Sequence, residues 1–331
     1  GVILPSRQRR NKMTAKAPVT GKRPFRMIAG VSVLADLADG AGAGWGYPGS
    51  GYVGKQYFVN NITGSSGASG LSWDDPFDQI TTAITASEAQ RQLPAETTNE
   101  YVRNQIFVQG TGTTYTNLAA LPNYCDIIGV GALSYGDGAG IVCIGLAGYD
   151  GIAGSARGLG LYNLQFQAPT GYYCADFVNL YRSEIAFCTF QSRVTDATAG
   201  MRFTGACSGV LVRNCAWTAG GGASWAVLGI SIEGPSFTNS IFEDNHVVAT
   251  NAAVYVISTC VTAGGTIFRN NNFGGTGLAW GVDDNATTGQ IVYTGNHICC
   301  VAGQGGALAN NGTARWVCNY SAATFSAVTA S

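Results

Sequence analysis

A loose repeat between Leu159 and Ser321 constrains the fold of this chain more than any other feature. Each copy has one or two apolar residues, then a marker that is usually asparagine, then a large apolar residue. The markers are Asn163, Phe187, Asn214, Asn245, Asn270, Asn296 and Asn319, spaced by 24, 27, 31, 25, 26 and 23 residues. A period of about 20–50 residues indicates an array of stacked units.

The composition of each unit favours strands. The units consist of short β-like runs broken by Gly, Asn, Ser and Thr, and none has room for a helix of about 10–12 residues. This excludes leucine-rich, ankyrin and tetratricopeptide arrays. Glycine supplies 47 of 331 residues and suits tight corners, while charged residues make up only 11%, against about 25% in ordinary globular proteins. The sequence therefore predicts a β-solenoid in which each repeat is one coil.

The charge of the chain is strongly asymmetric. Residues 1–30 contain no acid and eight basic residues, Arg7, Arg9, Arg10, Lys12, Lys16, Lys22, Arg23 and Arg26, whereas the rest of the chain carries 10 basic and 19 acidic residues. An arm of this kind rarely orders alone. We expect it to dock on a partner, either an acidic protein surface or nucleic acid; the alternative is a tail that only aids solubility.

The segments after the arm suggest a domain order. Residues 31–54 are a Gly-rich linker, and residues 55–331 form the repeat domain. Residues 78–92 are expected to form an amphipathic helix with Ile80, Ala83 and Ile84 on its apolar side, covering the open end of the first coil. The acidic pair Asp74-Asp75 is interpreted as part of the helix N-terminus, where negative charge is favourable. No run of 18 apolar residues exists, so no membrane span is expected, and the short run 27–38, interrupted by Asp36, is not a signal peptide.

The ten cysteines contain no Cys-x-x-Cys pair, which argues against zinc and redox motifs. Cys188, Cys215, Cys299 and Cys318 fall near the centre of the repeat. Coils stack about 4.8 Å apart, so these thiols would lie above one another in the core. We expect them to be buried and free, with an inter-coil disulfide as the alternative. A thiol-rich core favours assembly in a reducing cytoplasm.

The asparagine markers and the aromatic residues that follow them have structural explanations. An asparagine amide at a coil corner can bond the backbone, stack on its counterpart in the next coil and tolerate a left-handed turn. The aromatic residues three positions after a marker, Phe166, Phe190, Trp217 and Phe273, are expected to stack as a core column rather than as a sugar platform.

Candidate catalytic groups are few. Polysaccharide cleavage needs paired carboxylates on one face, and the acidic pairs within the repeats are Glu243-Asp244 and Asp283-Asp284. They are expected to lie on different sides of the coil, with Asp284-Asn285 in a turn. His246 and His297 share one register but are two coils, or about 10 Å, apart, too far to ligate one metal ion. The sequence thus predicts no catalytic, cofactor or metal site.

Three motifs at the start of the repeat domain resemble a known group: Gly70-Leu-Ser-Trp-Asp-Asp-Pro-Phe77, Ile106-Phe-Val-Gln-Gly-Thr-Gly-Thr-Thr-Tyr115 and Asp126-Ile-Ile-Gly-Val-Gly131. This order is similar to that of right-handed parallel β-helix proteins of the pectin-lyase-like superfamily, over residues 55–331. Members include polysaccharide lyases, glycoside hydrolases, bacterial surface proteins and the spike, fibre and capsid-decoration proteins of tailed phages. The Asn-Thr-Asp and Gly-His-Gly motifs of the hydrolase branch are absent here. The loop before Gly70, which often carries Asp in this group, is Ser-Ser-Gly-Ala-Ser.

These observations lead to one expectation and two alternatives. The fold class is all-β: a right-handed single-stranded parallel β-helix of about nine or ten coils, with an N-terminal capping helix and an extended basic arm. The resemblance and the arm favour a structural virion protein of a tailed phage that is assembled in the host cytoplasm. We expect the arm to attach it to capsid or tail proteins, and we expect the protein to be a homotrimer. The alternatives are a polysaccharide lyase or glycoside hydrolase acting on host surface glycans, and a bacterial surface or matrix protein. Carboxylates from adjacent coils gathered around Arg202, Arg213 or Arg269 would favour the enzyme.

Overall fold

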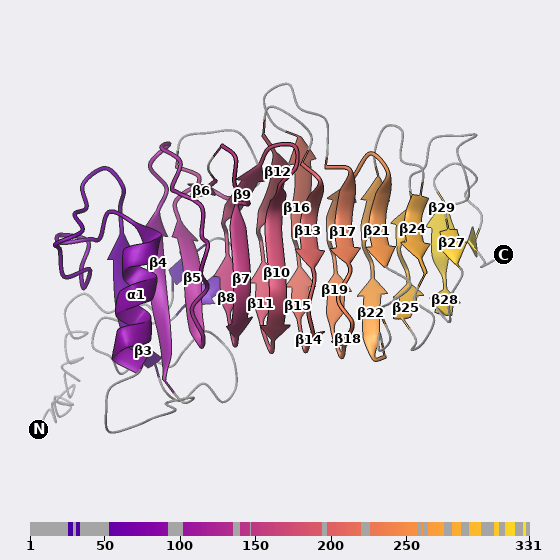
Figure 1. Ribbon diagram of the computed structural model, residues 1–331, viewed down its shortest axis with the longest axis horizontal. Coiled ribbons are helices and arrows are strands. Elements are labelled where there is room, and N and C mark those ends of the chain that lie inside the picture. The colour runs from indigo at the N-terminus through magenta and orange to yellow at the C-terminus, as the bar shows by residue number, and fades with distance from the viewer. Residues whose placement is uncertain are drawn as a thin grey trace, which may run out of the picture.

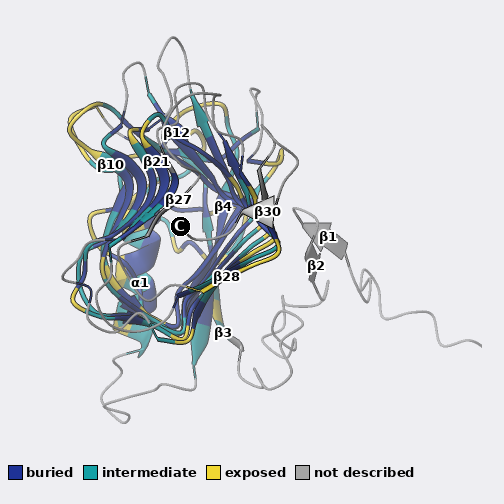
Figure 2. Cartoon of the chain, turned by 90° about the vertical axis from the view of Figure 1, so that its right-hand side faces the viewer, coloured by how far each residue is buried: buried dark blue, intermediate teal, exposed yellow. Residues whose placement is uncertain are grey.

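The computed structural model describes residues 26–28, 31–33, 53–91, 102–134, 140–145, 147–193, 197–219, 226–256, 260, 264–274, 280–285, 291–298, 308–310, 315–321 and 327–328. Within these residues, three long sheets run side by side along the molecule (Figure 1). Figure 2, viewed from the C-terminal end, shows them as three walls around a common interior, with much of each wall coloured as buried.

The first wall, sheet S1, has ten strands. They are β3 (Val53–Val59), β4 (Arg103–Gln109), β5 (Cys125–Val130), β8 (Gly160–Tyr162), β11 (Glu184–Ala186), β15 (Leu211–Arg213), β19 (Ile241–Glu243), β22 (Thr266–Arg269), β25 (Ile291–Thr294) and β28 (Arg315–Val317). Neighbouring strands pair in parallel and come from successive repeats, so each strand of S1 marks one coil.

The other two walls have nine strands each. Sheet S2 contains β6 (Cys143–Ile144), β9 (Gln165–Ala168), β12 (Thr189–Ser192), β16 (Ala216–Ala219), β20 (His246–Val248), β23 (Asn272–Gly274), β26 (His297–Ile298), β29 (Asn319–Ser321) and β30 (Ala327–Val328). Sheet S3 contains β7 (Ile152–Arg157), β10 (Tyr173–Tyr181), β13 (Ala199–Phe203), β14 (Cys207–Ser208), β17 (Leu228–Ile232), β18 (Phe237–Thr238), β21 (Ala252–Val256), β24 (Trp280–Asp284) and β27 (Leu308–Asn310).

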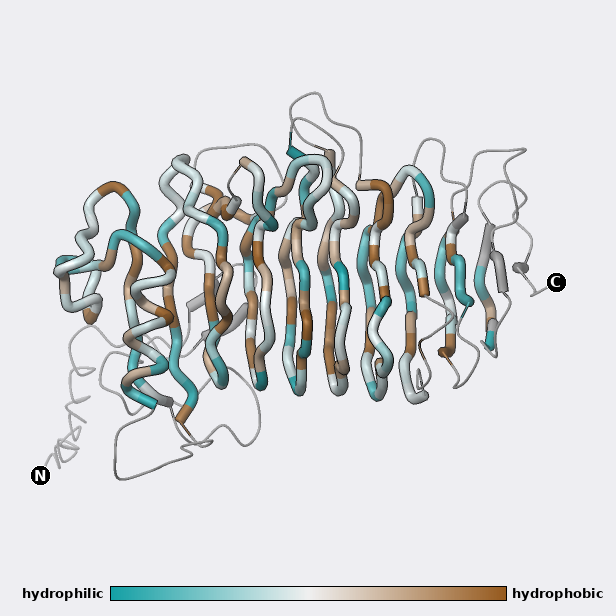
Figure 3. Tube along the Cα trace, viewed as in Figure 1, coloured by the Kyte–Doolittle hydropathy of each residue, from teal (hydrophilic) through white to brown (hydrophobic). Residues whose placement is uncertain are grey.

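The chain visits the walls in the order S3, S1, S2, as β10, β11 and β12 illustrate, and then returns to S3 at β13. The parallel pairing confirms the predicted parallel β-helix, and the ten strands of S1 agree with the expected number of coils. Along the coils, apolar and polar segments are interspersed (Figure 3), and the apolar side chains supply the common core. The last strand, β30, reverses direction and pairs antiparallel with β29.

Single residues in the left-handed conformation make two of the three corners. Between S1 and S2 these residues are Asn163, Phe187, Asn214, Asp244, Asn270, Gly295 and Cys318, with φ from +50° to +64°. Between S3 and S1 they are Tyr124, Gly158, Arg182, Gly209, Asn239 and Gly265, with φ from +47° to +74°. From β8 to β28 the same position after each S1 strand turns left-handed, and these strands pair without a register shift.

The repeat markers predicted from the sequence mix two adjacent columns. Asn163, Asn214 and Asn270 are corner residues, whereas Asn245, Asn296 and Asn319 lie one position later and point into the core, where they are 0–2% exposed. That inner column contains Leu164, Cys188, Cys215, Asn245, Asn271, Asn296 and Asn319. Asparagine suits both a left-handed corner and a buried amide ladder, so residue type alone could not separate the two positions.

The four consecutive asparagines of the inner column form a hydrogen-bonded ladder. The Oδ1 atom of Asn271 accepts the backbone N–H of Asn245 at 3.1 Å and its side-chain amide at 3.0 Å. In turn, the Nδ2 atom of Asn271 donates to the carbonyl oxygen of Phe242 at 3.0 Å and to Oδ1 of Asn296 at 2.9 Å. The pattern continues from Asn296 to Asn319. The ladder therefore satisfies polar groups inside the core and links each coil to the next.

The expected aromatic column exists. Phe166 stacks on Phe190 with ring centroids 5.7 Å apart, and Phe190 lies 4.9 Å from Trp217. Val247 separates Trp217 from Phe273 in the register of S2, so the column is aromatic only in part. On the inner face of S1, Phe242, Phe268 and Tyr293 stack at 4.3 and 5.1 Å, a second column that the sequence pattern did not reveal.

The cysteines follow the prediction in part. Cys188 and Cys215 are free, buried and stacked in successive coils. Cys318 is free but exposed, because it occupies the left-handed corner and not the inner column. The prediction that Cys318 is buried is therefore wrong, for the same reason that the markers were misaligned. Cys299 lies outside the described residues.

The only described helix, α1 (Ile80–Arg91), lies within the segment predicted to be helical and at the N-terminal end of the rod (Figure 1). Ile80, Ala83 and Ile84 are buried in the main core. The polar residue on the same side, Ser87, is fully buried and accepts a hydrogen bond from Nδ2 of Asn104 at 2.9 Å. This bond explains why a short polar side chain interrupts the apolar stripe.

Two features near the N-terminal end were not part of the sequence interpretation: a pair of short strands and the role of Asp75. The short strands β1 (Arg26–Ile28) and β2 (Val31–Val33) pair antiparallel across the boundary placed at residue 30. The carboxylate of Asp75 accepts the backbone N–H of Ser69 at 2.8 Å, and no acidic residue lies in the first turn of α1. Asp75 thus closes the preceding loop and does not start the helix, which corrects the interpretation of Asp75.

Candidate functional site

The outer face of sheet S3 gathers polar side chains around Arg202. The guanidinium group of Arg202 donates to both carboxylate oxygens of Asp176, at 3.0 and 2.7 Å, and to the hydroxyl of Tyr173 at 2.7 Å. It also lies 3.6 Å from the centroid of the Tyr173 ring, and Nη1 is 3.8 Å from Glu233. The bidentate hydrogen bonds to Asp176, together with stacking on the Tyr173 ring, hold the arginine in one orientation.

Successive coils supply this group, which we call the Arg202 cluster: Asp150, Tyr173, Asp176, Arg202 and Glu233. Asp150 precedes β7, Asp176 lies in β10, Arg202 in β13, and Glu233 directly follows β17. Strand register places Asp176 beside Arg202, and Arg202 beside Ser231, whose hydroxyl donates to Glu233 at 2.7 Å. The gathering of carboxylates around Arg202 is the arrangement that favours the enzyme among the alternatives.

Burial changes the acid–base properties of the cluster. Asp150 accepts the backbone N–H of Tyr173 at 2.8 Å. Its pKa is raised, because partial burial disfavours the charged carboxylate more than that hydrogen bond favours it. The pKa of Arg202 is also raised: burial alone lowers it, but the hydrogen bonds and charge of Asp176 outweigh burial. Burial therefore makes Asp150 a weaker acid than an exposed aspartate.

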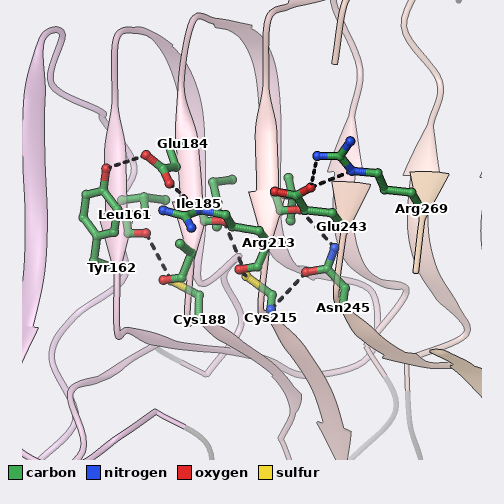
Figure 4. Close-up of polar contacts among 12 residues, drawn as sticks. Leu161, Tyr162, Glu184, Ile185, Cys188, Arg213, Cys215, Glu243, Asn245 and Arg269 are labelled. Carbon is green, nitrogen blue, oxygen red and sulfur yellow. Dashed lines mark hydrogen bonds and ion pairs between the residues drawn. The ribbon is translucent and has the colours of Figure 1, made fainter. Parts of the chain in front are cut away.

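The outer face of sheet S1 carries a second series of charged contacts (Figure 4). Glu184 accepts from the hydroxyl of Tyr162 at 3.0 Å and from Nε of Arg213 at 2.7 Å. Further along, Glu243 accepts from Nε of Arg269 at 2.7 Å. At the N-terminal end, Nε of Arg103 donates to Asp126 at 2.9 Å. Each arginine lies one coil away from its carboxylate.

Two adjacent columns of side chains on this face change along the rod: the apolar column becomes charged, and the charged column becomes apolar. In the first coils, one column is apolar and buried, with Phe107, Ile128, Tyr162 and Ala186, and its neighbour holds Asp126 and Glu184. From β15 onward the first column becomes charged, with Arg213, Glu243 and Arg269, and its neighbour becomes apolar and partly exposed, with Leu211, Ile241, Ile267 and Val292. The ion pair between Glu184 and Arg213 lies where the columns exchange.

The residues singled out from the sequence do not converge. Glu243 lies on S1 and Asp283 on S3, as expected. Asp284 is not in a turn: it ends β24, is buried and accepts from the hydroxyl of Tyr293 at 3.1 Å. His246 and His297 lie in one column with Asn272 between them, as their register predicted.

Of the eight basic arm residues, only Arg26 falls among the described residues, in β1; the others lie outside them. The sequence analysis also missed the pairing of Asp176 with Arg202. Their spacing of 26 residues equals one coil, and this was the available signal.

Among the described residues, no group of three or more His, Cys, Asp or Glu side chains is placed to hold a metal ion. None of the helices described here is long and apolar enough to cross a membrane.

No protein-family model matches the sequence, and no curated protein matches it. Among solved structures, the chain is similar to the pectin methylesterase from Aspergillus niger in its penultimately deglycosylated form, with 12% sequence identity and a TM-score of 0.40, over 84% of this chain and 87% of that chain. Similarity at this level transfers neither activity nor site residues. The coils themselves define the class: this is a parallel β-helix protein.

Proposed function

We propose that the chain is a structural virion protein of a tailed phage, with the β-helix projecting as a rigid rod from an N-terminal arm. The observation that carries this proposal is the way in which polar side chains join successive coils. Arg103–Asp126, Arg202–Asp176, Arg213–Glu184 and Arg269–Glu243 each connect neighbouring coils on the outside. Inside, the asparagine ladder does the same. Each coil contacts only its neighbours, so the stiffness of the rod depends on the bonds between adjacent coils. These cross-links therefore favour a rigid structural rod.

The basic arm supports the anchoring part of the proposal. Residues 1–30 carry a formal charge of +8 and the remainder −9. Separated charges of this size favour attachment through the arm to an acidic protein surface or to nucleic acid. The assignment to a tailed phage rests on the sequence resemblance.

Deleting residues 1–30 is expected to leave the rod folded and to abolish attachment. The truncated chain should keep the circular dichroism spectrum and melting temperature of the full chain, because the described core begins at β3. Incorporation is measured by supplying either version to particles that lack the native protein. A full-length chain with the eight basic residues changed to glutamine separates charge from length. Unchanged incorporation of the truncated chain would contradict the proposal.

A polysaccharide-acting enzyme is the second candidate, favoured by the carboxylates of the Arg202 cluster. If it is correct, Asp176→Asn should lower the release of reducing ends from a polysaccharide substrate about 100-fold or more, because a positioned acid or base contributes about that much. The exposed corner residue Asp244 provides the matched control, since Asp244→Asn alters an equal charge on another wall. Equal loss in both variants, or in neither, would count against the enzyme.

A further inference from the structure

We propose that the Arg202 cluster and two adjacent tyrosines form a binding site for neutral or N-acetylated oligosaccharides, and that the site discriminates against uronate-containing ones. The inference deepens the second candidate function, but it requires no bond cleavage and is compatible with a rod that recognises a glycan surface.

The aromatic part of the site consists of Tyr149 and Tyr172, which are 54% and 36% exposed. They come from adjacent coils. The hydroxyl of Tyr172 lies 4.0 Å from the position that a Cβ atom on Gly148 would occupy, so the two tyrosine segments are neighbours. Exposed tyrosines offer flat apolar rings with a polar edge, which suits the apolar faces and hydroxyls of a sugar ring. Most large apolar side chains of this size are instead buried in the core of the rod.

The polar part of the site adjoins these tyrosines along the chain. Tyr173 follows Tyr172, and Asp150 follows Tyr149; the two segments are joined by the hydrogen bond from the Tyr173 N–H to Asp150. Arg202 is held by Asp176 and by the Tyr173 ring. The carboxylates are therefore fixed before any ligand arrives, and little conformational entropy is lost on binding.

The charge of the cluster selects the ligand. Three carboxyl groups, Asp150, Asp176 and Glu233, lie around a single guanidinium group, so the acidic groups outnumber the cation. Both ends of the Arg202 guanidinium already bond Asp176 and Tyr173. A uronate would bring another negative charge without a free cation to meet it in this cluster, whereas the hydroxyls of a neutral or N-acetylated sugar can donate to the carboxylates.

Binding is tested on the full chain by isothermal titration calorimetry, with cellotetraose, maltotetraose, chitotetraose and tetragalacturonate as probes. At least one of the three uncharged probes is expected to bind, and tetragalacturonate to bind at least about tenfold more weakly, which corresponds to one like-charge contact. Tyr149→Ala combined with Tyr172→Ala should weaken the uncharged probe about tenfold or more. Trp73→Ala, an exposed aromatic at the N-terminal end, is the control and should change nothing.

The charge argument has its own variant. Asp150→Asn combined with Glu233→Gln removes acidic groups from the cluster, so the affinity for tetragalacturonate relative to that for the uncharged probe should rise about tenfold. Binding without release of reducing ends would support this site and reject the enzyme. Binding of none of the four probes, or tetragalacturonate as the tightest of them, would overturn the proposal.

Discussion

Replacing Asn271 by alanine is expected to lower the free energy of unfolding by about 3–5 kcal/mol. The substitution removes four hydrogen bonds at once: two that the side-chain oxygen accepts from Asn245 and two that the amide group donates to Phe242 and Asn296. The partners are buried in the core, where water does not replace the lost amide. The ladder makes the loss larger than that of one ordinary hydrogen bond, because neighbouring amides depend on each other.

Denaturant unfolding followed by circular dichroism measures this effect, and Asn270→Gly is the matched control. Asn270 precedes Asn271 but is exposed at a left-handed corner with φ of +55°, a conformation that glycine adopts freely. The control should therefore change stability by less than about 1 kcal/mol. A second variant, Asn271→Asp, keeps the shape and loses the donors, and should destabilise at least as much as alanine. Similar losses at positions 270 and 271 would show that the ladder is not the source of the stability.

Alkaline pH is expected to destabilise the rod steeply, beginning near pH 8.5. Burial raises the pKa of Cys174 and of Cys207 to about 12, and raises the pKa values of Cys125 and Cys188 as well. In the unfolded chain these thiols ionise near pH 8.5. The unfolded state therefore loses protons that the folded state keeps, so stability is fully present below pH 8.5 and falls as pH rises toward 12.

The expected slope is about 1.4 kcal/mol per pH unit for each such thiol, or about 5–6 kcal/mol per unit for four. A domain with an ordinary stability of about 5–15 kcal/mol would then unfold between about pH 9.5 and 11.5. Urea titrations at half-unit intervals from pH 7.5 to 11, with a reductant present, measure the slope. Changing Cys174 and Cys207 together to alanine should reduce it by about half. A stability that is constant from pH 8.5 to 10 would disprove the argument.

The repeat determined most of the fold. Its period, the shortness of its apolar runs and its many Gly and Asn residues left a coil of strands as the solution, and the structure has that architecture. The helix near Ile80 could also be predicted, because an apolar stripe with helical spacing is a local property of the chain. The stack of Phe166, Phe190 and Trp217 followed from the repeat in the same way.

The registers within the coil could not be derived from residue types. Asn270 and Asn271 are adjacent and identical, yet one turns the corner and the other occupies the ladder. Cys318 resembled Cys188 and Cys215 in sequence position and differed in exposure. A shift of one residue moves a side chain from the core to solvent in a strand, and a variable repeat length of 23–31 residues conceals that shift in the sequence.

The sequence by itself therefore determined the stacked coils, their apolar interior and the charge difference between arm and rod, because these depend on composition and period. Only the tertiary structure decided which side chains meet. Asp150, Asp176, Arg202 and Glu233 span more than 80 positions of the sequence (150 to 233) and come together only because successive coils stack in register. The ladder and the candidate site arise from that register, which is set jointly by the left-handed corners and the packing of neighbouring coils.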